Sequence, residues 1–153
     1  MRSDDLKLVA TNRRARYDYH LEDTLEAGLV LVGSEVKSLR LGRASLADSY
    51  ATVDQGEAYL HNMHISPYEQ ANRFNHEPKR TRKLLLNKDE IRTLAGKVSQ
   101  RGYTLVPVRV YFRRGRAKVE IALARGKKTY DRRRDIAERD ARRAIERALK
   151  ERR

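Results

Sequence analysis

The chain has no cysteine, so disulfide bonds and zinc sites that need cysteine ligands are excluded. No apolar run approaches the ~20 residues that a membrane-spanning helix needs. The amino-terminal residues, MRSDDLKLVA, lack the apolar stretch of a signal peptide. Together these absences predict a cytoplasmic protein.

The patterns of common catalytic sites are also missing. The serines form no nucleophile elbow, and Gly33 and Gly42 are too isolated for a phosphate-binding loop. The only suggestive histidine pair is His61 and His64, but alternating strand side chains would not place both on one face. We therefore expect surface histidines, no metal site, no cofactor and no catalytic centre.

Positive charge is in large excess. The chain has 35 Lys and Arg against 21 Asp and Glu, a net charge of +14, which predicts a polyanionic partner and nucleic acid first. An acidic membrane surface is the alternative. The basic carboxy-terminal segment has no Trp or Phe and only a thin apolar stripe, so it would be a poor membrane anchor, and we expect no membrane partner.

The spacing of apolar residues predicts a chain that is mainly β with two helices. A turn at residues 54–57 joins one predicted hairpin and a basic turn at residues 113–116 joins another, in which Pro107 indicates a bulge or sheet edge. Because the helices do not alternate with strands, we expect an antiparallel barrel of about six strands, over residues 1–125. The predicted extended segments are residues 15–21, 50–53, 58–60, 104–112 and 117–124, and residues 29–32 form a continuous apolar run.

Two helices are expected between these strands. Ser34 can cap a short helix that runs to Arg40 and is closed by Gly42. Asn87 can cap the second, with Glu90 reaching back to complete a capping box. Between the two helices, residues 66–83 follow neither a helix nor a strand period and end in cations, which favours a functional loop.

Residues 126–153 form a basic tail. They carry twelve Lys or Arg against six Asp or Glu, and their only large aliphatic residues are Ile136, Ile145 and Leu149. Such a segment cannot bury enough apolar area to offset its ordering entropy. We expect it to be disordered in the free protein and helical on a negatively charged partner; the alternative is a permanent helix packed on the barrel.

Cations gather at several places in a form that favours RNA. Guanidinium groups grip phosphates, and a nearby aromatic ring stacks on unpaired bases. The residues expected to contact RNA on this ground are Asn12, Arg13, Arg14 and Arg16 beside Tyr17, Lys37 and Arg40 on the first helix, and Arg80, Arg82 and Lys83 at the end of the loop. In the tail, Arg139, Arg143 and Arg147 recur on one helical face.

From Asn12 onward the chain resembles the SsrA-binding protein (small protein B) family. The resemblance rests on blocks that occur in the family's order: NRRARYDY at 12–19, EAG at 26–28, GSEVKSLR at 33–40, DSY at 48–50, RTRKLLLN at 80–87, Val106-Pro107, and GKKTYDRR at 126–133.

The resemblance implies an oligonucleotide-binding (OB)-fold-like barrel that binds the transfer-RNA-like domain of transfer-messenger RNA. It implies a tail that enters the decoding centre, built of 16S ribosomal RNA, and the empty messenger channel of a stalled ribosome. The protein would stand in for an anticodon arm in trans-translation, meet elongation factor Tu only through the charged RNA, and perform no covalent chemistry.

The resemblance also implies roles for single residues. Glu26, Arg40, Leu85 and Asn87 match RNA contacts of the family, with Arg13, Arg14 and Lys118 as neighbours. Because a carboxylate repels phosphate, Glu26 should accept hydrogen bonds from bases or riboses, or orient a neighbouring arginine. The tail motif that meets the decoding centre matches Tyr130, Asp131, Arg132 and Arg133, and Lys127 and Lys128 before it are further expected ribosome contacts.

Two other readings of the residues stay open. A structural ribosomal protein or ribosome assembly factor would need the same charge. A ribonuclease that uses His61 and His64 comes third.

Overall fold

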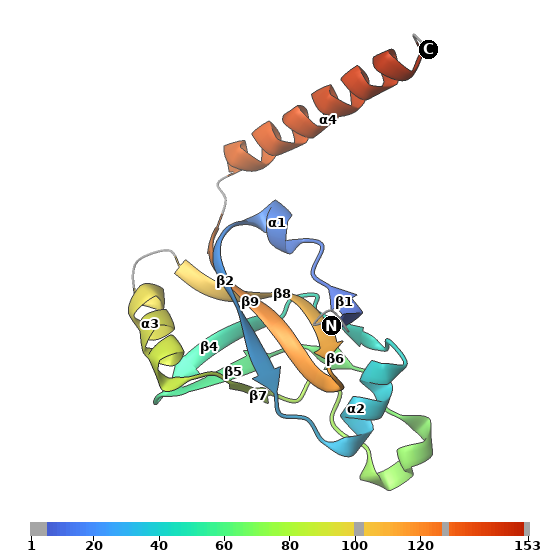
Figure 1. The fold of residues 1–153 in the computed structure, drawn as a ribbon, viewed down its shortest axis with the longest axis vertical. Coiled ribbons are helices and arrows are strands. Elements are labelled where there is room, and N and C mark those ends of the chain that lie inside the picture. The colour runs from blue at the N-terminus through green and yellow to red at the C-terminus, as the bar shows by residue number, and fades with distance from the viewer. Residues whose placement is uncertain (1–5, 100–102, 127–128, 152–153) are drawn as a thin grey trace.

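The computed structural model describes residues 6–99, 103–126 and 129–151 of the chain (Figure 1). Its elements are, in chain order, β1 (Leu6–Thr11), α1 (Ala15–Asp18), β2 (Tyr19–Leu29), α2 (Gly33–Arg40), β3 (Ala44–Ser45), β4 (Tyr50–Asp54), β5 (Glu57–His61), β6 (His64–Ile65), the 3-10 helix η1 (Glu69–Phe74), β7 (Arg82–Leu85), α3 (Lys88–Val98), β8 (Tyr103–Arg113), β9 (Arg116–Gly126) and α4 (Thr129–Glu151).

Six strands close into an antiparallel ring, in the order β8, β4, β5, β7, β2, β9 and back to β8. Strand β1 extends the sheet beside the second half of β8, and β4 meets the first half at Leu105. The ring confirms the predicted OB-fold-like barrel. In Figure 1, α2 and α3 lie at different sides of the barrel, and α4 leads away from it.

Both predicted hairpins are present. Left-handed residues make their tight turns, with φ of 49° and 76° at Gln55 and Gly56, and of 53° and 77° at Arg114 and Gly115. Two successive positive φ angles match the twist of the flanking strands. The register of β8 against β9 shifts just after Pro107, which confirms the predicted bulge.

One main core fills the barrel. Alternate residues of the ring point inward, and α2 and α3 each add a leucine, Leu39 and Leu94. Helix α3 begins as expected: Asn87 stands at its amino-terminal end, and the backbone N–H of Asn87 donates to Glu90 Oε1 at 3.0 Å.

The strand predicted over residues 15–21 is wrong in its first half, because residues 15–18 form the short helix α1. The N–H groups of Tyr17 and Asp18 both bond to the carbonyl of Arg14. Ala15 is buried against Val106 and Ala124 at one end of the barrel. The packing of Ala15 against these small residues thus fixes the turn between β1 and β2. It outweighs the alternating pattern of polar and apolar residues that predicted a strand here.

Ser34 is not the cap of α2. The cap position is Val32, two residues earlier, the helix begins at Gly33, and Glu35 Oε1 accepts the backbone N–H of Val32 at 3.0 Å. The Ser34 hydroxyl is buried and bonds instead to His76 Nδ1 at 2.8 Å. Gly42 closes the helix as expected, with φ of 74° and its N–H on the carbonyl of Leu39.

The basic tail is helical from Thr129 to Glu151. Its aliphatic side chains stay largely in solvent, with Ile145 61% and Leu149 60% exposed. The apolar stripe of α4 is thus not packed on the barrel, and the alternative of a permanent helix stays open. That the tail is disordered until it binds stays a prediction.

Candidate nucleic-acid interface

A basic hollow of about 580 Å³ lies where β2, β8 and β9 meet. Strand pairing builds it, since Lys118 lies opposite both Gly28 of β2 and Tyr111 of β8, and the tight turn sets Arg113 opposite Arg116. Its lining consists of four cations and one carboxylate: Arg113, Arg114, Arg116, Lys118 and Glu26. The hollow therefore carries the charge that attracts phosphate groups.

Glu26, the one carboxylate of the hollow, is held by two neighbours. The Tyr111 hydroxyl donates to Glu26 Oε2, and Arg113 Nε lies 3.3 Å from the same oxygen. Burial, followed by the bond to Glu26, raises the pKa of Tyr111 to about 12, so the phenol remains a donor at neutral pH. The guanidinium groups of Arg109 and Arg113 lie 5.1 and 5.6 Å from the Tyr111 ring centroid. Glu26 and Tyr111 together orient Arg113.

Two of the residues that the resemblance implies, Glu26 and Lys118, line this hollow, and Leu85 lies next to it across Gly28. Gly28, two residues after Glu26, pairs with Leu85 of β7 on one side and with Lys118 on the other. A Cβ added at Gly28 would lie 3.2 Å from Leu85 Cβ, so glycine leaves room for the leucine, which is 55% exposed. Asn87 is exposed two residues beyond Leu85.

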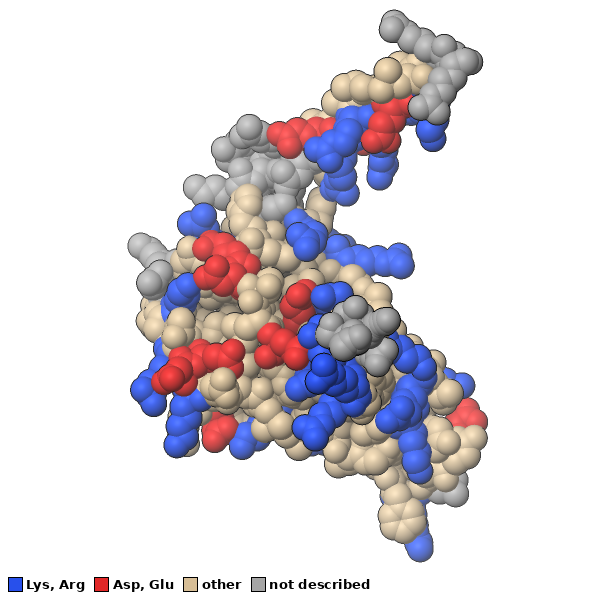
Figure 2. Space-filling model, viewed as in Figure 1, with Lys and Arg blue, Asp and Glu red and all other residues tan. Residues whose placement is uncertain are grey.

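Two exposed cations of α2 extend the positive surface. The Arg40 guanidinium lies 5.0 Å from the ring centroid of Phe112, the residue before Arg113. Lys37 lies one turn earlier on the helix, with Nζ 5.5 Å from the ring centroid of Tyr68. Figure 2 shows Lys and Arg side chains gathered near the start of β9 and near α2, and others along α4.

The predicted RNA contact of Arg82 is wrong, because its side chain has no exposed area. Its Nε donates to Glu35 Oε2 at 2.7 Å, so the buried guanidinium and carboxylate neutralise each other inside the fold. Arg80 donates from Nη2 to Glu35 Oε1 at 2.7 Å but stays partly exposed. Lys83 is exposed too, and its Nζ lies 3.1 Å from Glu57 Oε2. The functional loop expected at residues 66–83 is thus tied to α2 at its end.

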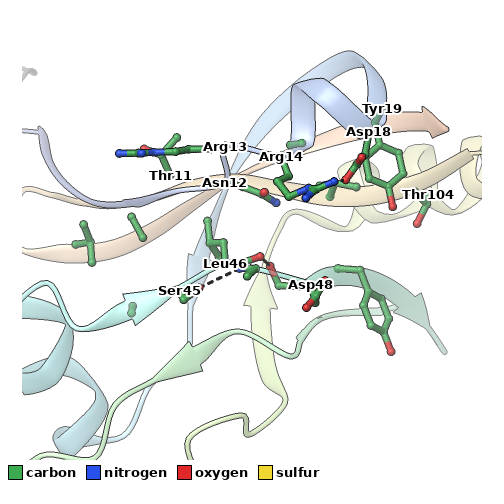
Figure 3. A pocket seen from close by; sticks show the side chains of 18 of the residues that line it. Thr11, Asn12, Arg13, Arg14, Asp18, Tyr19, Ser45, Leu46, Asp48 and Thr104 are labelled. Atoms are coloured by element: carbon green, nitrogen blue, oxygen red, sulfur yellow. Dashed lines mark hydrogen bonds and ion pairs between the residues drawn. The ribbon is translucent and has the colours of Figure 1, made fainter. Parts of the chain in front are cut away.

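Asn12, Arg13 and Arg14 line a larger hollow, of about 1120 Å³, between β1, α1 and residues 44–50 (Figure 3). Asn12 serves the fold, since its Nδ2 donates to the carbonyl of Pro107 at 2.9 Å and so supports the bulge. Arg14 is exposed, with Nε 3.5 Å from Asp18 Oδ2. Arg13 is exposed as well. The predicted amino-terminal cations therefore lie apart from the hollow of Glu26.

A third hollow, of about 440 Å³, lies between α1 and α4. Its lining is mostly basic: Arg13, Arg16, Tyr17, Glu138, Arg139 and Arg142. Arg16 and Arg139, predicted as parts of separate surfaces, are thus neighbours here.

The other tail residues are described in part. Arg133, Arg143 and Arg147 are exposed on α4. Lys127 and Lys128 lie outside the described residues, and so do the side chains of Tyr130, Asp131 and Arg132.

Two histidines, His61 and His76, hold neighbouring segments together. His61 Nε2 lies 2.8 Å from Thr52 Oγ1, and its ring stacks on Tyr50 at 4.9 Å. The buried His76 bridges Ser34 and the carbonyl of Ile65. Within the described residues, no group of three or more His, Cys, Asp or Glu is placed to hold a metal ion.

Three residues that line the hollow were missed as candidate RNA contacts: Arg113, Arg114 and Arg116. The basic turn between two alternating strands was a visible signal for the three arginines. Nothing in the sequence placed that turn beside Glu26, which lies 85 residues before Tyr111.

Comparison with known proteins gives one family. The family model described as "SmpB protein" matches residues 9–151. Proteins named SsrA-binding protein from Pelotomaculum thermopropionicum and Moorella thermoacetica are 64% and 62% identical, each over 96% of both chains. One from Listeria monocytogenes is 57% identical over 99% of both.

A solved structure is similar as well. It is described as "tmRNA-SmpB: a journey to the center of the bacterial ribosome", and one of its chains is 54% identical, with a TM-score of 0.66 over 78% of this chain and 84% of that one. In the described part of this chain, no helix is long and apolar enough to cross a membrane. Fold, family model and relatives agree, and the chain belongs to the SmpB family.

Proposed function

We propose that this protein is a two-part RNA-binding adaptor for trans-translation. The barrel binds the transfer-RNA-like domain of transfer-messenger RNA, and the tail enters the decoding centre and empty messenger channel of a stalled ribosome. The observation that carries the proposal is the separation of two basic surfaces: the hollow of Glu26 and Lys118 on the barrel, and the helix α4 that leads away from it (Figure 1).

The barrel surface has the composition of an RNA site. Cations from two strands and a turn surround one hydrogen-bonded carboxylate, and the exposed Leu85 offers an apolar contact beside them. Phosphates meet the cations, while the carboxylate accepts from amino groups or ribose hydroxyls. The mixture favours RNA over a plain polyanion such as an acidic membrane.

The tail suits a second polyanion. Arg139, Arg143 and Arg147 follow one another at intervals of four residues, on a helix whose Ile145 and Leu149 have no place in the barrel core. A helix with charge on one side and exposed aliphatic residues on the other can dock in a channel lined by RNA and protein. The motif at Tyr130 to Arg133 lies in the first turn of α4, where the chain has just left the barrel.

The adaptor performs no covalent chemistry and works in the cytoplasm, where ribosomes translate. Elongation factor Tu meets it only through the charged RNA.

Sequencing the RNA that copurifies with the protein tests the proposal. We expect one small RNA, transfer-messenger RNA, to be enriched, and association with ribosomes to be lost in a high-salt wash. A structural ribosomal protein would stay in ribosomal particles at high salt and would copurify with ribosomal RNA alone, and that result would contradict the proposal.

A further inference from the structure

The loop between β6 and β7 ends in an exposed aromatic tip, formed by Arg73 and Phe74 at the end of η1. The Phe74 ring is 77% exposed, more than any other large apolar side chain among the described residues. The Arg73 guanidinium lies 5.2 Å from the ring centroid. An exposed phenylalanine does not contribute the stabilising free energy that its burial would give. Its exposure therefore indicates contact with a binding partner.

The loop is held in shape without this ring. Asn75 bonds twice to the backbone of Tyr68, from Nδ2 to the carbonyl at 2.7 Å and from the Tyr68 N–H to Oδ1 at 2.8 Å. Behind the tip, the buried His76 donates from Nε2 to the carbonyl of Ile65, and its Nδ1 is hydrogen-bonded to the Ser34 hydroxyl, both at 2.8 Å. Phe74 takes part in none of these bonds. The loop thus presents the ring from a fixed base.

Two exposed cations of α2, Lys37 and Arg40, lie between the loop that carries the tip and the end of β8 that carries Arg113. Arg40 lies over Phe112, which precedes Arg113 of the hollow. Lys37, one turn earlier on α2, lies over Tyr68, the residue to which Asn75 ties the tip. A negatively charged strand that leaves the hollow can therefore follow Arg40 and Lys37 to the tip. This continuity favours the RNA bound on the barrel over a separate partner.

We propose that the Arg73–Phe74 tip stacks on one unpaired base of the RNA that the barrel binds. Every base has a flat face that an aromatic ring can cover, and the adjacent guanidinium can meet the phosphate of the same nucleotide. The inference rests on the proposed function, because it takes the RNA of the hollow as its ligand.

The affinity of the full-length protein for transfer-messenger RNA tests this inference. Removal of one base–aromatic contact is expected to raise the Kd about 5- to 150-fold for Phe74→Ala, whereas Phe74→Trp should keep the wild-type Kd or lower it. Leu149→Ala, which trims an exposed apolar residue of α4 outside the barrel, is the matched control and should leave the Kd unchanged. Thermal unfolding should be alike for all four proteins.

Two further readouts identify the contact. The slope of log Kd against log salt should stay the same in Phe74→Ala and fall by about one in Arg73→Ala, because only the arginine displaces a counterion. Chemical probing should reveal one unpaired nucleotide that wild type and Phe74→Trp protect and Phe74→Ala leaves open.

Different failures are distinguishable. If wild type binds the RNA and Phe74→Ala binds it equally well, the tip proposal is overturned and the proposed function stands. If that variant binds RNA normally but loses ribosome binding, the tip faces the ribosome and the proposal is likewise wrong. If wild type does not bind transfer-messenger RNA at all, the proposed function itself fails.

Discussion

The buried carboxylate of Glu35 balances the positive charge of two arginines in the barrel. It has no exposed area and faces two guanidinium groups, those of Arg80 and Arg82. Glu35→Gln would leave Arg82 buried without a counter-charge, and we expect a loss of about 3 to 5 kcal/mol in the free energy of unfolding, measured by urea denaturation. The exposed pair of Asp23 and Lys97 is the control, and Asp23→Asn should change stability little. Equal losses in the two variants would refute this role of Glu35.

The same carboxylate gives a pH dependence. Burial, the largest effect, raises the pKa of Glu35, but hydrogen bonds from Arg80, the Val32 N–H and Arg82 outweigh it, so the pKa lies below the ordinary 4.5. A group whose pKa is lowered by folding stabilises the native state above its unfolded pKa and loses that contribution as the pH falls through the folded value. The stability difference between wild type and Glu35→Gln should therefore be constant above about pH 5 and shrink below 4.5. A difference that grows with acid would contradict the assignment.

Arg116 tests the basic hollow itself. It is exposed at the β8–β9 turn and lines the hollow beside Lys118. Arg116→Ala should weaken transfer-messenger RNA binding and reduce the salt slope of log Kd by about one, because one phosphate contact is lost. Arg92→Ala, within α3, removes an exposed cation outside the hollow and should leave that slope unchanged. An unchanged slope in Arg116→Ala would remove this residue from the interface.

The burial and the hydrogen-bond partners of some single residues could not be predicted from the sequence. An argument from charge alone treats Arg80, Arg82 and Lys83 alike. In the structure Arg82 is buried, whereas Arg80 is partly exposed and Lys83 is exposed. The difference lies in Glu35, 47 residues before Arg82, which no local pattern connects to it. The prediction that Ser34 caps α2 was wrong for the same reason. Its hydroxyl is hydrogen-bonded to His76, which lies 42 residues later in the chain.

Elements with strong local signals were predictable. The α3 cap, the two hairpin turns and the bulge at Pro107 follow from residue types at fixed spacings. Helix α1 was not, because its four residues are fixed by the buried Ala15 and by the crossing from β1 to β2. The edge strand β1 was not predicted from the sequence. It is defined by its pairing with β8, which is distant in the chain.

Helix α4 can be weakened without altering its charge. Ala141→Gly with Ala144→Gly should cost about 1 kcal/mol of helix stability at each position. We expect the double variant to bind transfer-messenger RNA as wild type does, to show less helical circular dichroism on ribosomes, and to tag stalled products less. Replacement of both alanines by glutamine, a good helix former, is the control and should retain tagging. Normal tagging by the double glycine variant would show that helicity of α4 is not required.

The whole molecule joins a prefolded basic surface to a basic helix that leads away from the barrel (Figure 1). Composition predicted the excess of charge and the division near residue 126, because a core-poor segment follows a core-rich one. It did not predict the distribution of that charge over separate hollows, which depends on strand pairing within the ring. Composition likewise did not predict that α1 and α4 lie next to each other.

The two parts should be separable in function, and removal of residues 126–153 measures this most directly. The truncated protein keeps every residue of the basic hollow and the whole ring except the last residue of β9. Its Kd for transfer-messenger RNA should equal that of the full chain, while tagging of products on stalled ribosomes should be abolished. Normal tagging by the truncated protein, or loss of RNA affinity in a barrel that still unfolds cooperatively, would contradict the two-part adaptor.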